Sequence, residues 1–205
     1  YYLDKAKQEK FNISEAEVSQ YLEINNVIQG IFWTANKLYG LSFRERTEDY
    51  PQYHKQQQSW DVIDKKGNLI AIFYSDYYPR DGKGAGAWCG RFRPQSYDGA
   101  MRVQPIVTNV CNMTLPAEEG GPALQTVDNV LTMFHEFGHA LHSFFRDVQY
   151  EGTGGVERDF VELPSQINEH WAFEPEVHRQ YARHYRTGEV IPQELVEKID
   201  ASSKY

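Results

Sequence analysis

The chain has 205 residues, of which 40% are hydrophobic and 14% aromatic, and 21 basic against 29 acidic residues give a formal net charge of −8. This length and composition predict a soluble globular chain with one sizeable core, and an acidic chain without a basic run excludes nucleic acid as an expected partner. No apolar run reaches the roughly 20 residues that cross a bilayer, so we expect no membrane anchor.

The first part of the chain is expected to be a helical lead-in over residues 1–50. Ser14, with Glu17 three residues later, has the pattern of a capping box. Further apolar residues recur at helical spacing and form one stripe that Gly40 ends, namely Val27, Ile28, Ile31, Phe32, Ala35 and Leu38.

A small sheet is expected over residues 57–113. The segment "SWDVIDKKGNLIAIFYSDYY" contains two extended runs around a turn at Lys65 to Gly67, which predicts a β-hairpin, and strands continue through "GAWCGRF" and "QPIVTNVCN". The intervening "PRDGKGAGAW" is predicted to be a flexible connection rather than a phosphate loop, because no G-K-[ST] and no helix follow it. Cys89 and Cys111 are interpreted as two buried thiols rather than a disulfide framework.

The second half of the chain is expected to be helical. Thr126 is a plausible N-cap for a helix over residues 126–146, and after the loop "EGTGGVERD" another helix begins near Asp159, with further helices to residue 205. The order helix, small sheet, long helix, loop, helix predicts an α+β, mainly helical fold with a small antiparallel sheet rather than a βαβ series.

The stretch "FHEFGHALHSFF" carries the strongest chemical signal. His135, Glu136 and His139 spell H-E-x-x-H, and two histidines four residues apart share one helical face and can bind one zinc ion. Glu136 can then act as the general base that takes a proton from the attacking water. The alternative is a chance match on a histidine-rich helix. Against it stands Gly138, which costs about 1 kcal/mol relative to alanine inside a helix and so indicates close packing there.

The third ligand cannot be chosen from spacing. A hydrolytic zinc site has three protein ligands and an open position. Phe145 stands ten residues after His135, where a longer zinc-peptidase pattern has another histidine, so a carboxylate further along is expected. The candidates are Glu157, Glu162 and Glu169. Glu162 and Glu169, seven residues apart, would share one face of the following helix.

The remaining histidines are expected to have other roles. His142 lies two turns from His135, too far to share the ion comfortably, so it either faces the substrate or packs in the fold. The other four are interpreted as ordinary surface histidines: His54, His170, His178 and His184.

The pair of segments "FHEFGHALH" and "ERDFVELPSQINEHW" closely resembles the thimet-oligopeptidase family of zinc peptidases, and the second is most similar to its bacterial peptidyl-dipeptidase branch. The resemblance extends through "GIFWTANKLYGLSF", "FYSDYYPRDGKGAGAW" and "PIVTNVCN". It implies a zincin-like core, one Zn²⁺ held by His135, His139 and Glu162, and Glu136 as the base. It also implies that strands around "GAW" and "IVTN" line a cleft for short peptides, which bind along exposed backbone. Gly86, Ala87 and Asn109 would then lie near the substrate, with a packing role equally open for each side chain.

Two departures from the family pattern qualify this expectation. The loop between the two segments is shorter than in typical members, and the chain contains neither the later segment with a histidine and tyrosines nor the long helical N-terminal half. We therefore expect residues 1–205 to be a partial catalytic domain of a larger zinc peptidase that releases C-terminal dipeptides. An endo-acting oligopeptidase and a zinc- or peptide-binding module without turnover remain open alternatives. The expected location is the cytoplasm, with the periplasm as the alternative because the chain begins at Tyr1 without methionine.

Overall fold

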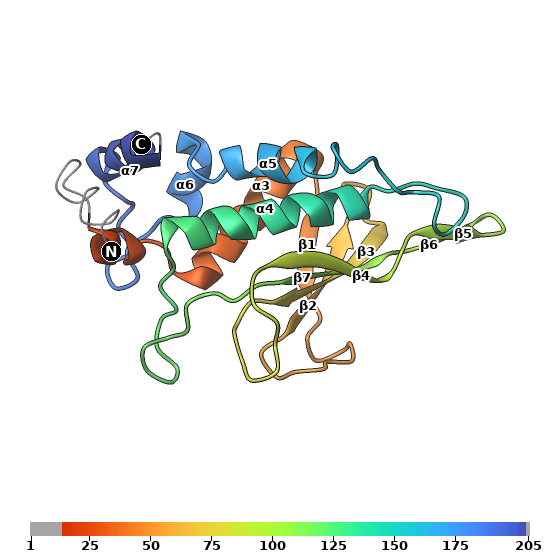
Figure 1. Cartoon of the computed structure of the whole chain (residues 1–205), viewed down its shortest axis with the longest axis horizontal. Coiled ribbons are helices and arrows are strands. Elements are labelled where there is room, and N and C mark those ends of the chain that lie inside the picture. Colours follow the sequence, from red (N-terminus) through yellow and green to blue (C-terminus); the bar gives the residue numbers. More distant parts are fainter. Residues whose placement is uncertain (1–13, 204–205) are drawn as a thin grey trace.

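The computed structural model describes residues 14–203, in which helices cover one side of a small sheet (Figure 1). The helices are α2 (Glu15–Ser19), α3 (Ile24–Tyr39), α4 (Val127–Phe144), α5 (Leu163–His170), α6 (Pro175–Tyr181) and α7 (Gln193–Ser203). The strands are β1 (Ser42–Glu45), β2 (Gln58–Ile63), β3 (Leu69–Asp76), β4 (Trp88–Arg93), β5 (Ser96–Asp98), β6 (Met101–Val103) and β7 (Ile106–Val110). The α+β expectation is confirmed.

Helix α3 follows the predicted apolar stripe. The Glu23 carboxylate accepts hydrogen bonds from the amides of Asn25 and Asn26 at its start, and Gly40 ends it in the left-handed conformation with φ 72°. The stripe from Val27 to Ala35 is buried, whereas Leu38 is exposed. The helix therefore packs through its first three turns and leaves its last turn partly free.

The expected helical lead-in is wrong in two details. Ser14 is the N-cap residue of α2, but its side chain makes no capping hydrogen bond to any described residue, so the capping box does not form. Residues 42–45 form β1, which pairs antiparallel with β2, so the helical part of the expected 1–50 segment ends at Tyr39. Residues 1–13 lie outside the described residues.

The five-stranded sheet has the order β1-β2-β3-β7-β4, and β5 and β6 form a separate antiparallel pair. The predicted hairpin joins β2 and β3, but β3 and β7 are parallel, and β4 is antiparallel to β7. The sheet is therefore mixed, and the antiparallel expectation is wrong. The reason is topological: the chain passes from β3 to the edge strand β4, and later returns to insert β7 between them.

The core lies between the sheet and the helices. Phe73 of β3 packs edge-to-face against Phe137 and Phe144 of α4, with ring centroids 5.5 and 5.7 Å apart. His178 of α6 is also buried, at 1% exposure, and its Nδ1 lies 3.1 Å from the Glu174 carbonyl oxygen, so the surface interpretation of this histidine is wrong. Cys89 is half-buried and Cys111 fully buried, and both are free thiols. No helix in residues 14–203 is both long enough and apolar enough for a membrane crossing.

Candidate metal centre

Helix α4 presents the two histidines on one face. The Thr126 hydroxyl accepts a hydrogen bond from the Asn129 amide and begins the helix at the predicted position. The apolar face of α4 is buried through Phe134, Phe137 and Phe144. His135 and His139, one turn apart, are left partly exposed with ring centroids 5.0 Å apart. Packing of one helical face thus fixes the direction of the other.

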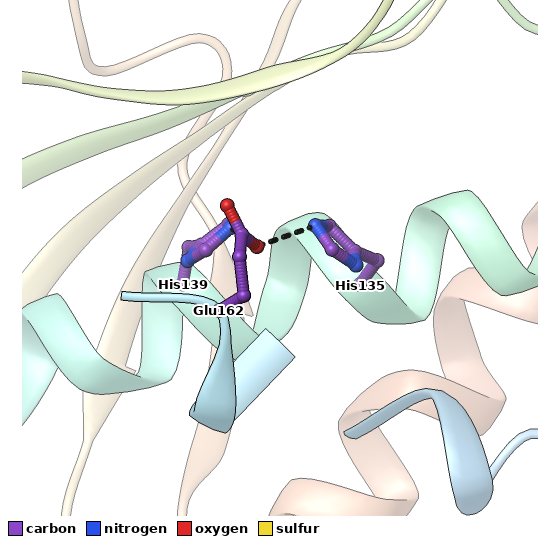
Figure 2. Close-up of side chains that lie close together, drawn as sticks. All are labelled: His135, His139 and Glu162. Carbon is purple, nitrogen blue, oxygen red and sulfur yellow. Dashed lines mark ion pairs between the residues drawn. The ribbon is translucent and has the colours of Figure 1, made fainter. Parts of the chain in front are cut away.

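Glu162 completes the group from the start of α5 (Figure 2). It occupies the N-cap position, and Ser165 donates hydrogen bonds to its carbonyl oxygen and to its Oε2 at 2.7 and 2.8 Å. This oxygen lies 3.2 Å from the Nε2 atoms of both His135 and His139. Glu162 therefore precedes the helix on which it was expected, which begins at Leu163 rather than near Asp159.

The donor set fits a divalent metal ion. The ligand atoms of His135, His139 and Glu162 all lie within 4.8 Å of one another. Two imidazole nitrogens and a carboxylate are a ligand set that zinc uses in hydrolytic sites, with one position left open. Burial lowers the pKa of His139, which favours the neutral imidazole that a metal requires. The hydrogen bond from Ser165 lowers the pKa of Glu162 and favours its carboxylate form.

Glu136 lies beside this group but is much less exposed. Its exposure is 6%, and its Oε2 is buried without a hydrogen-bond partner among the described residues. Burial raises its pKa to about 7, with His135 lowering it and Glu162 raising it. A buried carboxyl group with an unused oxygen next to a candidate metal centre is the arrangement expected of a general base.

Three further contacts hold the group in place. Glu169 Oε1 lies 2.5 Å from His135 Nδ1, which orients this imidazole from its other nitrogen. Asn168 donates to the Phe134 carbonyl oxygen at 2.6 Å, and Asn109 of β7 donates to the Glu136 carbonyl oxygen at 2.8 Å. Helix α4 is therefore fastened to α5 on one side and to the sheet on the other.

Gly138 allows α5 to approach α4 closely. A Cβ atom at this position would lie 2.6 Å from the Pro164 carbonyl oxygen and 2.7 Å from Ser165 Cα. The close packing that this glycine indicated is confirmed. It also brings Glu162, at the start of α5, within reach of the two histidines.

The family model for Peptidase family M3 matches residues 1–205. The chain belongs to peptidase family M3. Over 208 residues it is 45% identical to the dipeptidyl carboxypeptidase of Escherichia coli (strain K12), a match that covers 100% of this chain and 30% of that protein. The expected family resemblance is thereby confirmed.

Other relatives carry different names. The chain is 37% identical over 212 residues to oligopeptidase A of Salmonella typhimurium, covering 100% of this chain and 30% of the relative. It is 32% identical over 209 residues to saccharolysin of Saccharomyces cerevisiae, covering 97% and 29%. The M3 chain thus spans about 30% of the length of the curated relatives it matches.

The structure places the other predicted site residues of this M3 chain outside the three-residue group. Glu157 is exposed and does not join it. His142 lines an apolar cavity of about 380 Å³ between α4 and α5, together with Leu141, Phe145, Phe160 and Ile167.

The three positions expected near the substrate lie at or beside the edge strand. Gly86 forms a turn with φ 87° just before β4, and Ala87 is half-buried. Asn109 is fully buried in β7, where its amide holds α4. Its side chain is therefore engaged with α4, and a role near the substrate stays a prediction for these positions.

Sequence reasoning missed one structural partner of the site, Asn168, and a buried lysine in the connection before β4. Asn168 lies within "PSQINEHW", three residues after Ser165, a spacing that places both on one helix face. Lys83 was overlooked in the glycine-rich connection, where its Nζ is bound by Asp76, Tyr78 and Cys111. Its position between Gly82 and Gly84 is the feature of the sequence that could have drawn attention to it.

Proposed function

We propose that this chain is the zinc-binding core of a peptidase that cleaves short peptides and releases C-terminal dipeptides. The observation that carries the proposal is the group His135, His139 and Glu162 with the buried carboxyl of Glu136 beside it. Membership of peptidase family M3 and the 45% identity to a dipeptidyl carboxypeptidase support it.

In this proposal the three ligands hold the ion and Glu136 moves the proton. Zinc in such a site acts as a Lewis acid that makes water nucleophilic near neutral pH. The free Oε2 of Glu136 takes the proton of the attacking water and passes it to the departing amine. Glu169, bound to His135 Nδ1, keeps that ring turned toward the centre.

The substrate backbone would lie along β4. This strand is at the edge of the sheet and packs against α4, the helix that carries the two histidines. An extended peptide can add to such an edge through main-chain hydrogen bonds, which tolerate many side chains. Trp88 and the turn at Gly86 lie where β4 begins.

The test combines metal analysis with peptide cleavage. The chain, and a longer polypeptide that contains it, are loaded with zinc and compared for metal content and for cleavage of one short peptide with a free or an amidated C-terminus. We expect about one zinc per chain, and cleavage only of the free form, with the dipeptide as product. Cleavage of both forms would favour the alternative, an endo-acting oligopeptidase. Zinc binding without cleavage by either polypeptide would instead support the alternative of a metal-binding module without turnover.

A further inference from the structure

The segment between β3 and β4 has an unusual path. Strands β3 and β4 are both neighbours of β7, so residues 77–87 must cross over the end of β7 to reach the edge of the sheet. A crossing segment has no strand beside it to supply a ladder of hydrogen bonds. Something else must fix it, and the glycine-rich sequence alone predicts a flexible connection.

Lys83 supplies that attachment. Its side chain is only 3% exposed, and its Nζ lies within hydrogen-bond distance of the carbonyl oxygens of Asp76, Tyr78 and Cys111 at 2.9, 2.7 and 2.5 Å. Asp76 ends β3 and Cys111 directly follows β7. One ammonium group therefore joins the ends of two strands to the segment that passes over them.

The charge of Lys83 is balanced inside the fold. Asp76 Oδ1 lies 3.0 Å from Nζ, and the same carboxylate binds Arg80 through two hydrogen bonds and Tyr53 through its hydroxyl. A buried ammonium group without such partners would strongly destabilise the fold, so the Asp76 carboxylate is what allows Lys83 to be buried here. The Arg80 guanidinium, in contrast, hydrogen-bonds to the Asp76 carboxylate and lies over the Tyr53 ring, 5.7 Å from its centroid, without reaching the strand-end carbonyl groups that Lys83 binds.

The attachment continues to the start of β4. Asn112, next to Cys111, donates to the carbonyl oxygens of Gly84 and Gly86 at 2.9 and 2.8 Å. Trp88 packs over Gly84, whose Cβ would lie 3.7 Å from its ring. The segment is thus tied at Lys83, Gly84 and Gly86 before β4 begins, contacts that its glycine-rich sequence does not indicate.

We propose that Lys83 is a positioning residue that holds the edge strand β4 ready to receive a peptide beside the metal centre. The proposal rests on the proposed function, because it assigns β4 as the peptide-binding edge. A preformed edge avoids the cost of ordering the segment when the peptide binds, so Lys83 acts on peptide affinity rather than on the proton transfer.

The first test needs no substrate. Backbone hydrogen exchange is measured on the free chain for Lys83→Met and for Arg80→Met, a control that removes a cation from the same carboxylate and segment. We expect exchange in residues 84–93 to rise about tenfold or more in Lys83→Met, with α4 and β2 unchanged, and to stay near wild type in Arg80→Met. Unchanged exchange in Lys83→Met, or an equal rise in both variants, would overturn the proposal.

The second test uses zinc-loaded chain and penta-alanine with free termini. Lys83→Met should weaken peptide binding about tenfold while zinc affinity stays at the wild-type value, and in a cleaving polypeptide KM should rise with kcat unchanged. A loss of zinc affinity equal to the loss of peptide affinity would indicate a general structural role and refute the assignment. If wild-type chain does not bind the peptide, the docking edge in the proposed function fails, and the exchange data still decide whether Lys83 holds β4.

A milder variant guards against a misfolded Lys83→Met. Asn112→Ala removes only the contacts to Gly84 and Gly86. It should increase exchange in residues 84–88 and weaken penta-alanine binding. Wild-type values for both measurements would overturn the proposal.

Discussion

Replacing Gly138 by alanine should weaken metal binding without touching any ligand. The added Cβ would lie 2.6 Å from the Pro164 carbonyl oxygen, 2.7 Å from Ser165 Cα and 3.0 Å from Asn168 Cβ. Ordinary contacts of carbon atoms are about 3.5 to 4.0 Å, so α5 must move away from α4 by roughly 1 Å. Glu162 directly precedes α5 and moves with it.

The effects on stability and on metal affinity should differ in size. Alanine gains about 1 kcal/mol of helix propensity over glycine, whereas overpacking costs about 1 to 3 kcal/mol, so the free energy of unfolding should fall by no more than about 2 kcal/mol. Metal sites tolerate distance changes of only about 0.2 Å, so a shift of Glu162 by roughly 1 Å should lower zinc affinity at least about tenfold.

Competition with a chelator measures the affinity, and thermal unfolding of the metal-free chain measures the stability. Gly155→Ala is the matched control, because nothing lies within 4 Å of a Cβ at that position. Wild-type zinc affinity in Gly138→Ala, or the same loss in Gly155→Ala, would refute the argument that close packing of α5 on α4 places Glu162.

Three further predictions concern single carboxyl groups. Glu136→Gln should retain stoichiometric zinc and lose about 10² to 10⁴ in cleavage rate in any polypeptide in which the site is active, and near-wild-type turnover would reject Glu136 as the base. Glu162→Ala should lose most of its zinc affinity, whereas Glu169→Ala should lose only about 10 to 100-fold. Competition with a chelator compares the two variants. Equal zinc affinities for Glu162→Ala and wild type would show that the third ligand is another residue. Asp76 has its pKa lowered from 3.8 to about 2, where burial is outweighed by Arg80, Tyr53 and Lys83. The contribution of ionised Asp76 to the free energy of unfolding is therefore complete above about pH 4 and is lost as the pH falls toward 2. The free energy of unfolding of Asp76→Asn, measured as the pH is lowered, should lack this part of the decline.

The sequence predicts features that depend on neighbouring residues. Thr126 and the apolar spacing place α4 almost to the residue, and His135, Glu136 and His139 follow from that helix. Gly138 also indicated a close helix contact from sequence alone, because glycine lowers helix stability relative to alanine and tight packing at that position must offset the loss.

Features that depend on distant parts of the chain could not be predicted in this way. The three candidate glutamates were inseparable because the chain turns between Glu157 and Glu162 before α5 begins, and no helical repeat extends across a turn. The parallel pairing of β3 with β7 joins residues 34 positions apart, and the Lys83 ammonium contacts the Cys111 carbonyl 28 positions away. Local spacing contains no information about such contacts.

The open edge at β4 also creates a hazard, since an unpaired strand can join the edge of another molecule and start aggregation. Arg91 and Arg93 are exposed on this strand, and its register with β7 is interrupted between them. Positive charge repels a second copy of the same edge, and the irregularity bends the strand away from a long, straight partner. Only the stretch from Trp88 to Arg91 keeps regular pairing with β7, so the straight part of this edge is too short to template a long intermolecular sheet.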